Sequence, residues 1–324
     1  MRPKKEEIAR AAAALRAGRL VVMPTETVYG LAASALNARA LGRVFAAKGR
    51  PADNPLIVHV GSKAELARVA ASVPALARKL VRAFWPGPLT VVVPAAPSLP
   101  RAVTAGLATV AVRMPAHPVA LALIRAAGVP VAAPSANRSG RPSPTTVAHA
   151  RGDLGCAVAV YLDGGPAEHG LESTVVDCTG PRPVVLRPGA ITVEQIQRVC
   201  GDLAIGTRGA DAPRSPGMKY RHYAPSARVW VIEGRATEAR AGVQRTLGRL
   251  AAADRRAGVI AIGDERYAGA EVFRVPTLAA LGRELYAIFR EADARGLEDL
   301  VVRAVPERGL GRALMNRMRK AAER

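Results

Sequence analysis

The chain has 324 residues, 49% of them apolar, and a formal net charge of +21. This length predicts two domains, with enough apolar residues to bury a core in each. The three cysteines, Cys156, Cys178 and Cys200, are widely spaced. That pattern argues against a disulfide framework or a clustered zinc site and favours a reducing, cytoplasmic compartment. No apolar run is long enough to span a membrane, so we expect no membrane contact.

The positive charge has two explanations that the sequence leaves open. Arginine far outnumbers lysine, a bias that GC-rich codon usage produces, and the basic residues are spread along the chain. On this explanation the charge forms a solvated surface. The alternative is a contact with an anionic RNA, for instance a weak electrostatic contact with tRNA.

Residues 1–200 alternate between apolar runs and amphipathic segments, which is typical of an α/β sheet. Strands are expected at 19–23, 55–60, 89–95, 108–115, 129–134, 157–165, 173–179 and 183–189. Helices are expected at 5–17, 37–48, 62–71, 74–84, 117–128 and 192–200, with a short helix after the Ser/Pro-rich loop 135–146. We assign these residues to one domain.

The periodicity stops at 201–227, a Gly- and Pro-containing stretch that predicts a linker or a functional lid. A smaller α/β domain follows at 228–324. Its strands are expected at 228–234, 258–263, 271–276 and 299–305, and its helices at 237–256, 278–294 and 311–323. This order is Rossmann-like, but no G-x-G-x-x-G follows the first strand, so the dinucleotide fingerprint is absent.

No motif in the sequence indicates a P-loop, a zinc protease, a thiol redox centre or a serine hydrolase. The first domain instead places polar groups in loops and at strand ends, where open α/β sheets bind ligands. The cations are Lys48, Arg50, Arg113 and Arg187, and the neutral polar residues are Thr27, Ser135, Asn137, Ser143 and Ser173. This inventory suits polyphosphate binding and nucleotidyl transfer, in which positioning and charge neutralisation dominate.

Most of these residues also have a structural explanation. Lys48 and Arg50 follow a helix, where cations offset the helix dipole, and Ser135 and Asn137 are residue types that form turns. Arg113 is harder to explain in this way, because it lies in the apolar run VAVRMP. Burying its charge is costly unless it faces an anion.

Six segments in a fixed order resemble a known family. They are PTETVYGL (24–31), KGRPADNPLIVH (48–59), TVAVRMP (109–115), APSANRSG (133–140), STVVD (173–177) and LRPG (186–189). Together they resemble the YrdC-domain threonylcarbamoyl-adenylate synthases. SPGMKYRHYAP (215–225), followed by a small α/β domain, is similar to the long, two-domain form of that family.

The resemblance implies a YrdC-like domain with a twisted, open, mixed sheet. It implies an enzyme that takes L-threonine, bicarbonate and ATP to L-threonylcarbamoyl-AMP and pyrophosphate. The product would feed the tRNA threonylcarbamoyl transferase machinery, which modifies the adenosine beside the anticodon. Mg²⁺ would enter with the ATP phosphates, without metal ligands from the protein.

The motif positions also imply roles for individual residues. The residues expected to bind threonine are Thr27, His59, Arg113 and Ser173. The residues expected to bind ATP are Lys48, Arg50, Asn54, Thr109, Ser135, Ser143, Arg187 and Tyr223, with Tyr220 as a second candidate for the last. The expected catalytic signature is Lys48, Arg50, Ser135 and Asn137. The segment 201–225 is expected to act as a lid that keeps water from the carbamate.

Two other functions compete with this one. The positive charge would suit a non-catalytic module that binds double-stranded RNA or tRNA. A carbamoyl transferase of the hydrogenase-maturation type uses a related domain. It is expected to carry zinc-finger cysteines and an acylphosphatase domain, for which this chain has no room.

Overall fold

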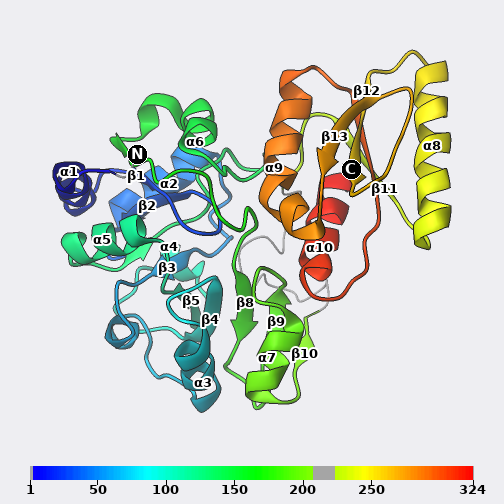
Figure 1. Ribbon diagram of the computed structural model, residues 1–324. Coiled ribbons are helices and arrows are strands. Elements are labelled where there is room, and N and C mark those ends of the chain that lie inside the picture. Colours follow the sequence, from blue (N-terminus) through cyan, green and yellow to red (C-terminus); the bar gives the residue numbers. More distant parts are fainter. Residues whose placement is uncertain (1–2, 207–222, 324) are drawn as a thin grey trace. The chain divides into compact units, whose positions relative to one another are not determined.

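The computed structural model describes residues 3–206 and 223–323 (Figure 1). The chain divides into two compact units, one formed by residues 1–139 and 143–220 and the other by 140–142 and 221–324. Both are α/β, as predicted. Most of the expected lid, including Tyr220, lies outside the described residues. Among the described residues, no helix is long and apolar enough to cross a membrane.

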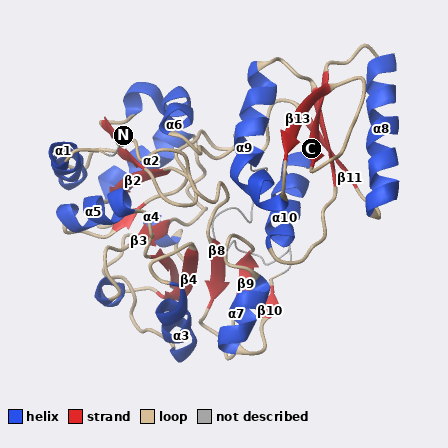
Figure 2. Cartoon of the chain, in the orientation of Figure 1, coloured by secondary structure: helices blue, strands red, loops and turns tan. Residues whose placement is uncertain are grey.

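The first unit contains one mixed sheet, whose strands are among those drawn in red in Figure 2. In the described residues its strand order is β10-β9-β8-β4-β5-β3-β6-β2-β1-β7. The strands are β1 (Val21–Met23), β2 (Gly30–Ser34), β3 (Ile57–His59), β4 (Leu89–Pro94), β5 (Thr109–Arg113), β6 (Val131–Ala132), β7 (Val160–Tyr161), β8 (Thr174–Asp177), β9 (Val184–Arg187) and β10 (Ala204–Ile205). The pairs β3/β5 and β4/β8 are parallel, whereas β4/β5 is antiparallel. The mixed sheet that the resemblance implied is therefore confirmed.

The helices of this unit surround the sheet. They are α1 (Lys5–Arg16), α2 (Ala38–Lys48), α3 (Ala75–Phe84), α4 (Arg101–Thr104), α5 (Pro118–Ala127), α6 (Val147–Leu154) and α7 (Val193–Cys200), with short 3₁₀ turns at Ala64–Arg68 and Gly155–Ala157. The side chain of Asn37 caps α2 by accepting a hydrogen bond from Ala40 N at 3.1 Å, as predicted. Gly49 ends the same helix with φ +59°, which suits glycine.

The two faces of the central strands differ in what covers them. Alternate residues such as Val91, Val110 and Val112 belong to the main core, together with side chains of α3. Their neighbours on the other face form a separate small cluster of Ile57, Val92, Ala111 and Val175, with Leu186 packed against it. Because side chains alternate along a strand, this second face carries a small apolar floor bordered by polar strand ends.

Several elements differ from the expected ones. Strand β2 was not predicted, because its sequence GLAAS consists of small residues with weak strand preference. The expected helix 62–71 is only a 3₁₀ turn, and the expected strand 157–165 narrows to β7. The stretch predicted to be irregular from 201 onward begins with β10, which pairs with β9 in parallel.

The second unit has a parallel sheet with strand order β11-β14-β12-β13 among the described residues. Its strands are β11 (Arg228–Ile232), β12 (Ala257–Ile262), β13 (Glu271–Val275) and β14 (Asp299–Arg303), and its helices are α8 (Ala236–Ala252), α9 (Leu278–Ala294) and α10 (Leu310–Ala322). Helix α8 covers one face, and α9 and α10 cover the other (Figure 1). The predicted Rossmann-like arrangement of strands and helices is confirmed.

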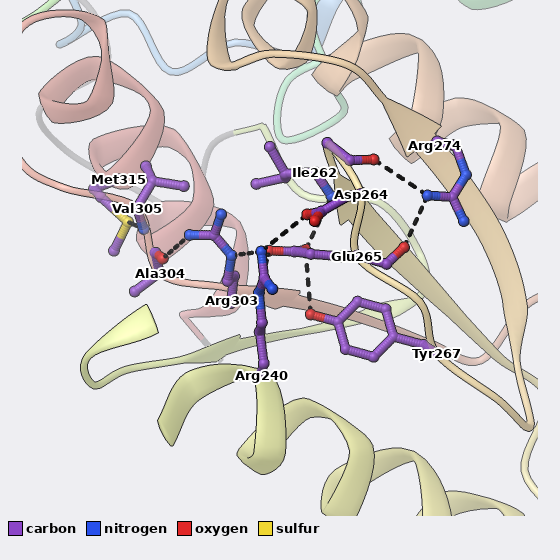
Figure 3. A network of polar contacts seen from close by, with 11 residues as sticks. Arg240, Ile262, Asp264, Glu265, Tyr267, Arg274, Arg303, Ala304, Val305 and Met315 are labelled. Atoms are coloured by element: carbon purple, nitrogen blue, oxygen red, sulfur yellow. Dashed lines mark hydrogen bonds and ion pairs between the residues drawn. The ribbon is translucent and has the colours of Figure 1, made fainter. Parts of the chain in front are cut away.

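A polar network joins the carboxyl ends of β12 and β14 in this unit (Figure 3). The side chain of Glu265 is fully buried and pairs with Arg303 and with Arg240, the latter at 3.3 Å. It also accepts hydrogen bonds from Ile262 N at 2.9 Å and from the hydroxyl of Tyr267 at 3.2 Å. Every contact of this carboxylate is thus made within the second unit, which gives it a structural role there.

Candidate active site of the first unit

Arg113 ends β5 with its guanidinium group held on three sides. Its Nε donates to Gly87 O at 3.2 Å and its Nη1 to Thr27 Oγ1 at 2.8 Å. Its Nη2 forms an ion pair with Glu26 Oε1 at 2.6 Å, and both side chains are only 4% exposed. The structure therefore brings together Thr27 and Arg113, as predicted, and adds an acidic partner that the sequence analysis did not single out.

The turn after β1 presents these groups through hydrogen bonds of its own. Thr25 Oγ1 donates to Val28 O at 2.6 Å and lies 2.8 Å from Thr27 Oγ1. Such hydroxyl bonds to nearby backbone fix a turn that has no regular secondary structure. They place Glu26 and Thr27 on the same side of the turn as Arg113. The motif PTETVYG thus forms a turn whose polar side chains contact Arg113.

His59 lies beside Arg113, because the parallel pairing of β3 with β5 sets the two residues opposite each other. It is 3% exposed. Burial, and then the positive charge of Arg113, lower the pKa of His59 to about 3. At neutral pH this imidazole is uncharged, so it can exchange hydrogen bonds with a ligand without adding charge.

Ser173 lies immediately before β8, next to two other polar residues. Its hydroxyl is 2.8 Å from Thr90 Oγ1, a contact in which either atom could be the donor, and it accepts from Arg187 Nη2 at 3.1 Å. Arg187 Nε also donates to Ser173 O at 3.1 Å. Thr90 lies opposite Arg113 in the β4/β5 pair. Ser173 and Arg113 therefore border the same part of the sheet, and Thr90 is a further polar residue of the site.

Lys48, at the end of α2, is buried and holds the loop that follows β6. Its ammonium group donates to Ser135 O at 2.5 Å and to Asn137 O at 2.6 Å. Burial holds its pKa well below the usual value of a lysine. The expected signature residues Lys48, Ser135 and Asn137 thus do come together. In its ammonium form the lysine has a third N–H bond, which these two carbonyls do not use.

Arg50 and Asn54 form a second small arrangement after α2. Arg50 Nη2 donates to Asn54 O at 3.2 Å and to Pro55 O at 2.9 Å. The side chain of Asn54 is fully buried, and neither its amide nitrogen nor its amide oxygen has a hydrogen-bond partner among the described residues. Buried amides are nearly always paired in folded proteins, so this one is suited to a ligand that supplies both a donor and an acceptor.

Ser143 is fully buried and donates to Glu172 Oε1 at 2.6 Å. The expected ATP contact is therefore linked to an acidic residue directly before Ser173. Thr109 begins β5 at the end opposite to Arg113, with Ala111 of the apolar floor between them on the same face. A ligand that reached both residues would extend along β5 by about 13 Å, four residues of strand.

Tyr223 belongs to the second unit, where its side chain is 6% exposed. Its ring stacks on Tyr286 with centroids 5.6 Å apart, and the guanidinium of Arg317 lies 5.1 Å from its centroid. The structure thus gives Tyr223 a packing role in that unit. The ATP contact expected of it stays a prediction.

The polar residues of the first unit form two groups that suit different parts of a ligand. Around Arg113, a cation, a neutral imidazole and hydroxyl groups face one another, which suits an amino acid carboxylate and hydroxyl. Around Lys48, Arg50 and Asn54, cations and an unpaired amide suit phosphates and a nucleotide. Among the described residues, no cluster of three or more His, Cys, Asp or Glu could hold a metal ion.

Comparison with known proteins identifies the family of the chain. Residues 13–189 match the Sua5/YciO/YrdC family model, described as telomere recombination, and residues 191–323 match the model of the threonylcarbamoyl-AMP synthase C-terminal domain. The chain belongs to the two-domain Sua5 family. Because both matched models belong to the Sua5 family, and together they cover residues 13–189 and 191–323, the hydrogenase-maturation alternative is set aside.

Relatives in the Sua5 family match nearly the whole chain. The threonylcarbamoyl-AMP synthase of Pyrococcus abyssi is 46% identical over 96% of this chain and 93% of its own length. That of Bacillus subtilis is 44% identical over 98% of this chain and 93% of its own length. The crystal structure of P. abyssi Sua5 complexed with L-threonine superposes with a TM-score of 0.95 at 44% identity, covering 99% of this chain and 96% of that one.

A separate surface hollow of about 980 Å³ lies beside α1 and the segment 155–161 of the same unit. Its lining includes Arg10, Arg19 and Arg151 but none of the residues expected to bind threonine or ATP. Its volume alone does not make this hollow the site. The buried ion pair and the unpaired amide lie elsewhere, and they identify the site better than volume does.

Proposed function

We propose that this chain is an L-threonylcarbamoyl-AMP synthase, an enzyme that joins L-threonine, bicarbonate and ATP into L-threonylcarbamoyl-AMP and releases pyrophosphate. The observation that carries the proposal is the cluster of Arg113, Thr27, His59 and Ser173 in one buried corner. The Sua5 relatives named as this synthase, and the threonine complex of one of them, support it.

Threonine binds with its carboxylate on Arg113, whose planar fork matches a carboxylate. The hydroxyl groups of Thr27 and Ser173 and the neutral ring of His59 contact the rest of the substrate. Threonine enters with its amine protonated, and this ammonium group must lose its proton before the amine can take up carbon dioxide or bicarbonate as a carbamate. A free carbamate reverts in water, so the dry surroundings of these residues, all under 5% exposed, protect it.

The carbamate oxygen then attacks the α-phosphorus of ATP, the bond to the β-phosphate oxygen breaks, and pyrophosphate leaves. Lys48 and Arg50 neutralise charge that grows on the phosphates in this step. Asn54, Ser135, Asn137, Ser143 and Arg187 hold the nucleotide, with Thr109 at its far end. The cation-rich and carboxylate-poor residues around Lys48 fit a metal that ATP would carry in; Mg²⁺ would then supply part of the charge neutralisation at the phosphates.

The product supplies a tRNA threonylcarbamoyl transferase, because a mixed carbamate–phosphate anhydride is an activated group donor. We infer a cytoplasmic location. The three cysteines are all free thiols, as a reducing compartment maintains them.

The decisive experiment measures pyrophosphate release from the purified chain with ATP and Mg²⁺, adding threonine and bicarbonate singly and together. The proposal expects release only when all substrates are present, and it expects threonylcarbamoyl-AMP in the mixture by mass spectrometry. Release that needs neither threonine nor bicarbonate, or no release at all, would refute the proposed reaction. No release together with tight tRNA binding would favour the RNA-binding alternative.

A further inference from the structure

Each nitrogen of the Arg113 guanidinium already has a protein partner among the described residues. Its Nε and Nη1 are used by Gly87 O and Thr27 Oγ1, and its Nη2 is used by Glu26. A carboxylate that binds this guanidinium therefore competes with these partners. Glu26 is the partner with the same chemistry, since it presents a carboxylate to the guanidinium at 2.6 Å.

Among the described residues, Glu26 has no ion-pair partner besides Arg113. Burial alone would raise its pKa, but Arg113 beside it outweighs that effect and holds the pKa below the usual value, so the carboxylate is charged. The backbone N–H groups of Ala116 and of Glu26 itself lie near enough to contribute, yet neither carboxylate oxygen makes a hydrogen bond of normal geometry within the part of the chain that the structure describes. A buried carboxylate that lost Arg113 would need another cation.

An amino acid substrate brings that cation with it. Its carboxylate can pair with Arg113, and its ammonium group can pair with Glu26. When a zwitterion enters, each charge of the protein exchanges its partner for one on the substrate, and no charge is left unpaired in the dry site.

We propose that Glu26 determines specificity for the zwitterionic amino acid: it occupies the Nη2 edge of Arg113 in the ligand-free protein and turns to bind the substrate's α-ammonium group when the substrate carboxylate takes that edge. The inference rests on the proposed function, which makes the substrate an amino acid. The inference adds Glu26 to the residues expected to bind threonine, and it gives a physical reason for selectivity. A hydroxy acid that carries the carboxylate but lacks the ammonium group displaces Glu26 without giving it a new partner.

The test compares binding of L-threonine and of 3-hydroxybutanoate, which lacks the amino group, to the full chain by titration calorimetry. The unaltered chain is expected to prefer threonine by about 10²-fold or more, as for a buried charge left without its partner. In Glu26→Gln, threonine binding should weaken by about 10²-fold, while 3-hydroxybutanoate binding should stay unchanged or improve, because no internal carboxylate competes for Arg113.

A purely structural role for Glu26 gives a different result, because damage to the pocket weakens both ligands alike and leaves their ratio unchanged. That outcome in Glu26→Gln would overturn the proposal. Glu265→Gln is the matched control: it removes a buried carboxylate with arginine partners from the second unit and should leave the ratio as it is in the unaltered chain.

Glu26→Asp covers the case in which Glu26→Gln does not fold. It keeps the charge on a shorter side chain, so threonine should still be preferred, with a ratio at least threefold below that of the unaltered chain. An unchanged ratio in this variant would overturn the proposal. Failure of the unaltered chain to bind threonine would instead refute the proposed substrate, and that result is distinct from any change seen only in the Glu26 variants.

Discussion

Lys48 offers a sharp test of how the site is built, because its ammonium group holds two carbonyls of one loop. Lys48→Met keeps the length of the side chain and removes the donor. Ser135 O and Asn137 O then lie in a buried region without this partner, and each unsatisfied group costs about 1–3 kcal/mol. The variant no longer buries an ammonium group, and this gain offsets part of the cost of the two unsatisfied carbonyls. We expect the free energy of unfolding of the first unit to fall by about 3 kcal/mol, a large share of the 5–15 kcal/mol of a typical domain.

The chain allows this unit to be measured separately. It has two tryptophans: Trp85, buried in the first unit and hydrogen-bonded to Leu89 O at 2.8 Å, and Trp230 in the second. A Trp230→Phe background leaves Trp85 as the fluorescent probe of urea unfolding. Lys79→Met, an exposed lysine of α3, is the matched control and should change the unfolding free energy by less than about 0.5 kcal/mol.

Pyrophosphate release should fall by about 10²-fold or more in Lys48→Met, as for loss of a transition-state charge contact. The activity is measured where Trp85 fluorescence shows the variant folded, so instability does not explain the loss. If the variant unfolds at the same urea concentration as the unaltered chain, the carbonyl contacts do not stabilise the loop. If it also turns over normally, neither the loop-holding role nor the phosphate role of Lys48 is correct.

Four further outcomes are expected. Arg113→Lys keeps the charge but loses the fork, so the KM for threonine should rise much more than the KM for ATP; equal increases would contradict a carboxylate role. Because the folded pKa of His59 is about 3 and the reference value 6.5, only the unfolded chain takes up this proton between those values. Stability should therefore decrease as pH falls from about 6.5 to about 3, and His59→Gln should flatten that slope in urea titrations. Tyr223→Ala should destabilise the second unit by about 3–5 kcal/mol, seen through Trp230 in a Trp85→Phe background; a loss under 1 kcal/mol would show that the stacking is dispensable. Binding of tRNA, measured by filter retention, should be weak and fall steeply with salt; tight, sequence-selective binding at physiological salt would contradict a merely solvated charge.

The order and type of most elements could be predicted from the sequence, because buried strands such as LTVVVP and capped helices such as the one after Asn37 carry strong local signals. Strand β2 carried none, since Gly and Ala do not favour strands on their own; its pairing with β1 and β6 decides its conformation. Strand β10 is similar: two residues in a polar stretch become a strand only because β9 provides an edge.

The site was predictable in its cations and hydroxyls but not in its acids. Arg113 stood out because a charge in an apolar strand needs a partner, yet the sequence could not say that the partner is Glu26, 87 positions earlier. The sequence signal that could have identified Glu26 is its position between two threonines in the turn after a buried strand. Lys48 was expected to face phosphate. Its bonds to carbonyls of a loop 87 and 89 residues away depend on a tertiary contact that no local pattern encodes.

These contacts have one consequence for how ligands enter. Arg113, Lys48 and Arg187 each have protein partners already: a carboxylate, two carbonyls and a serine. Binding at such groups is an exchange of partners, so its free energy is the difference between two paired states and depends on how well the ligand matches the partner it replaces. A ligand with the wrong charges then leaves a protein group unpaired, which is a strong basis for rejection. Asn54 differs, because its buried amide has no partner to give up among the described residues, and contact there adds hydrogen bonds without removing any. On this proposal, we expect selectivity to depend on Arg113 and its partner Glu26, and we expect the Asn54 amide to add to the affinity for nucleotide.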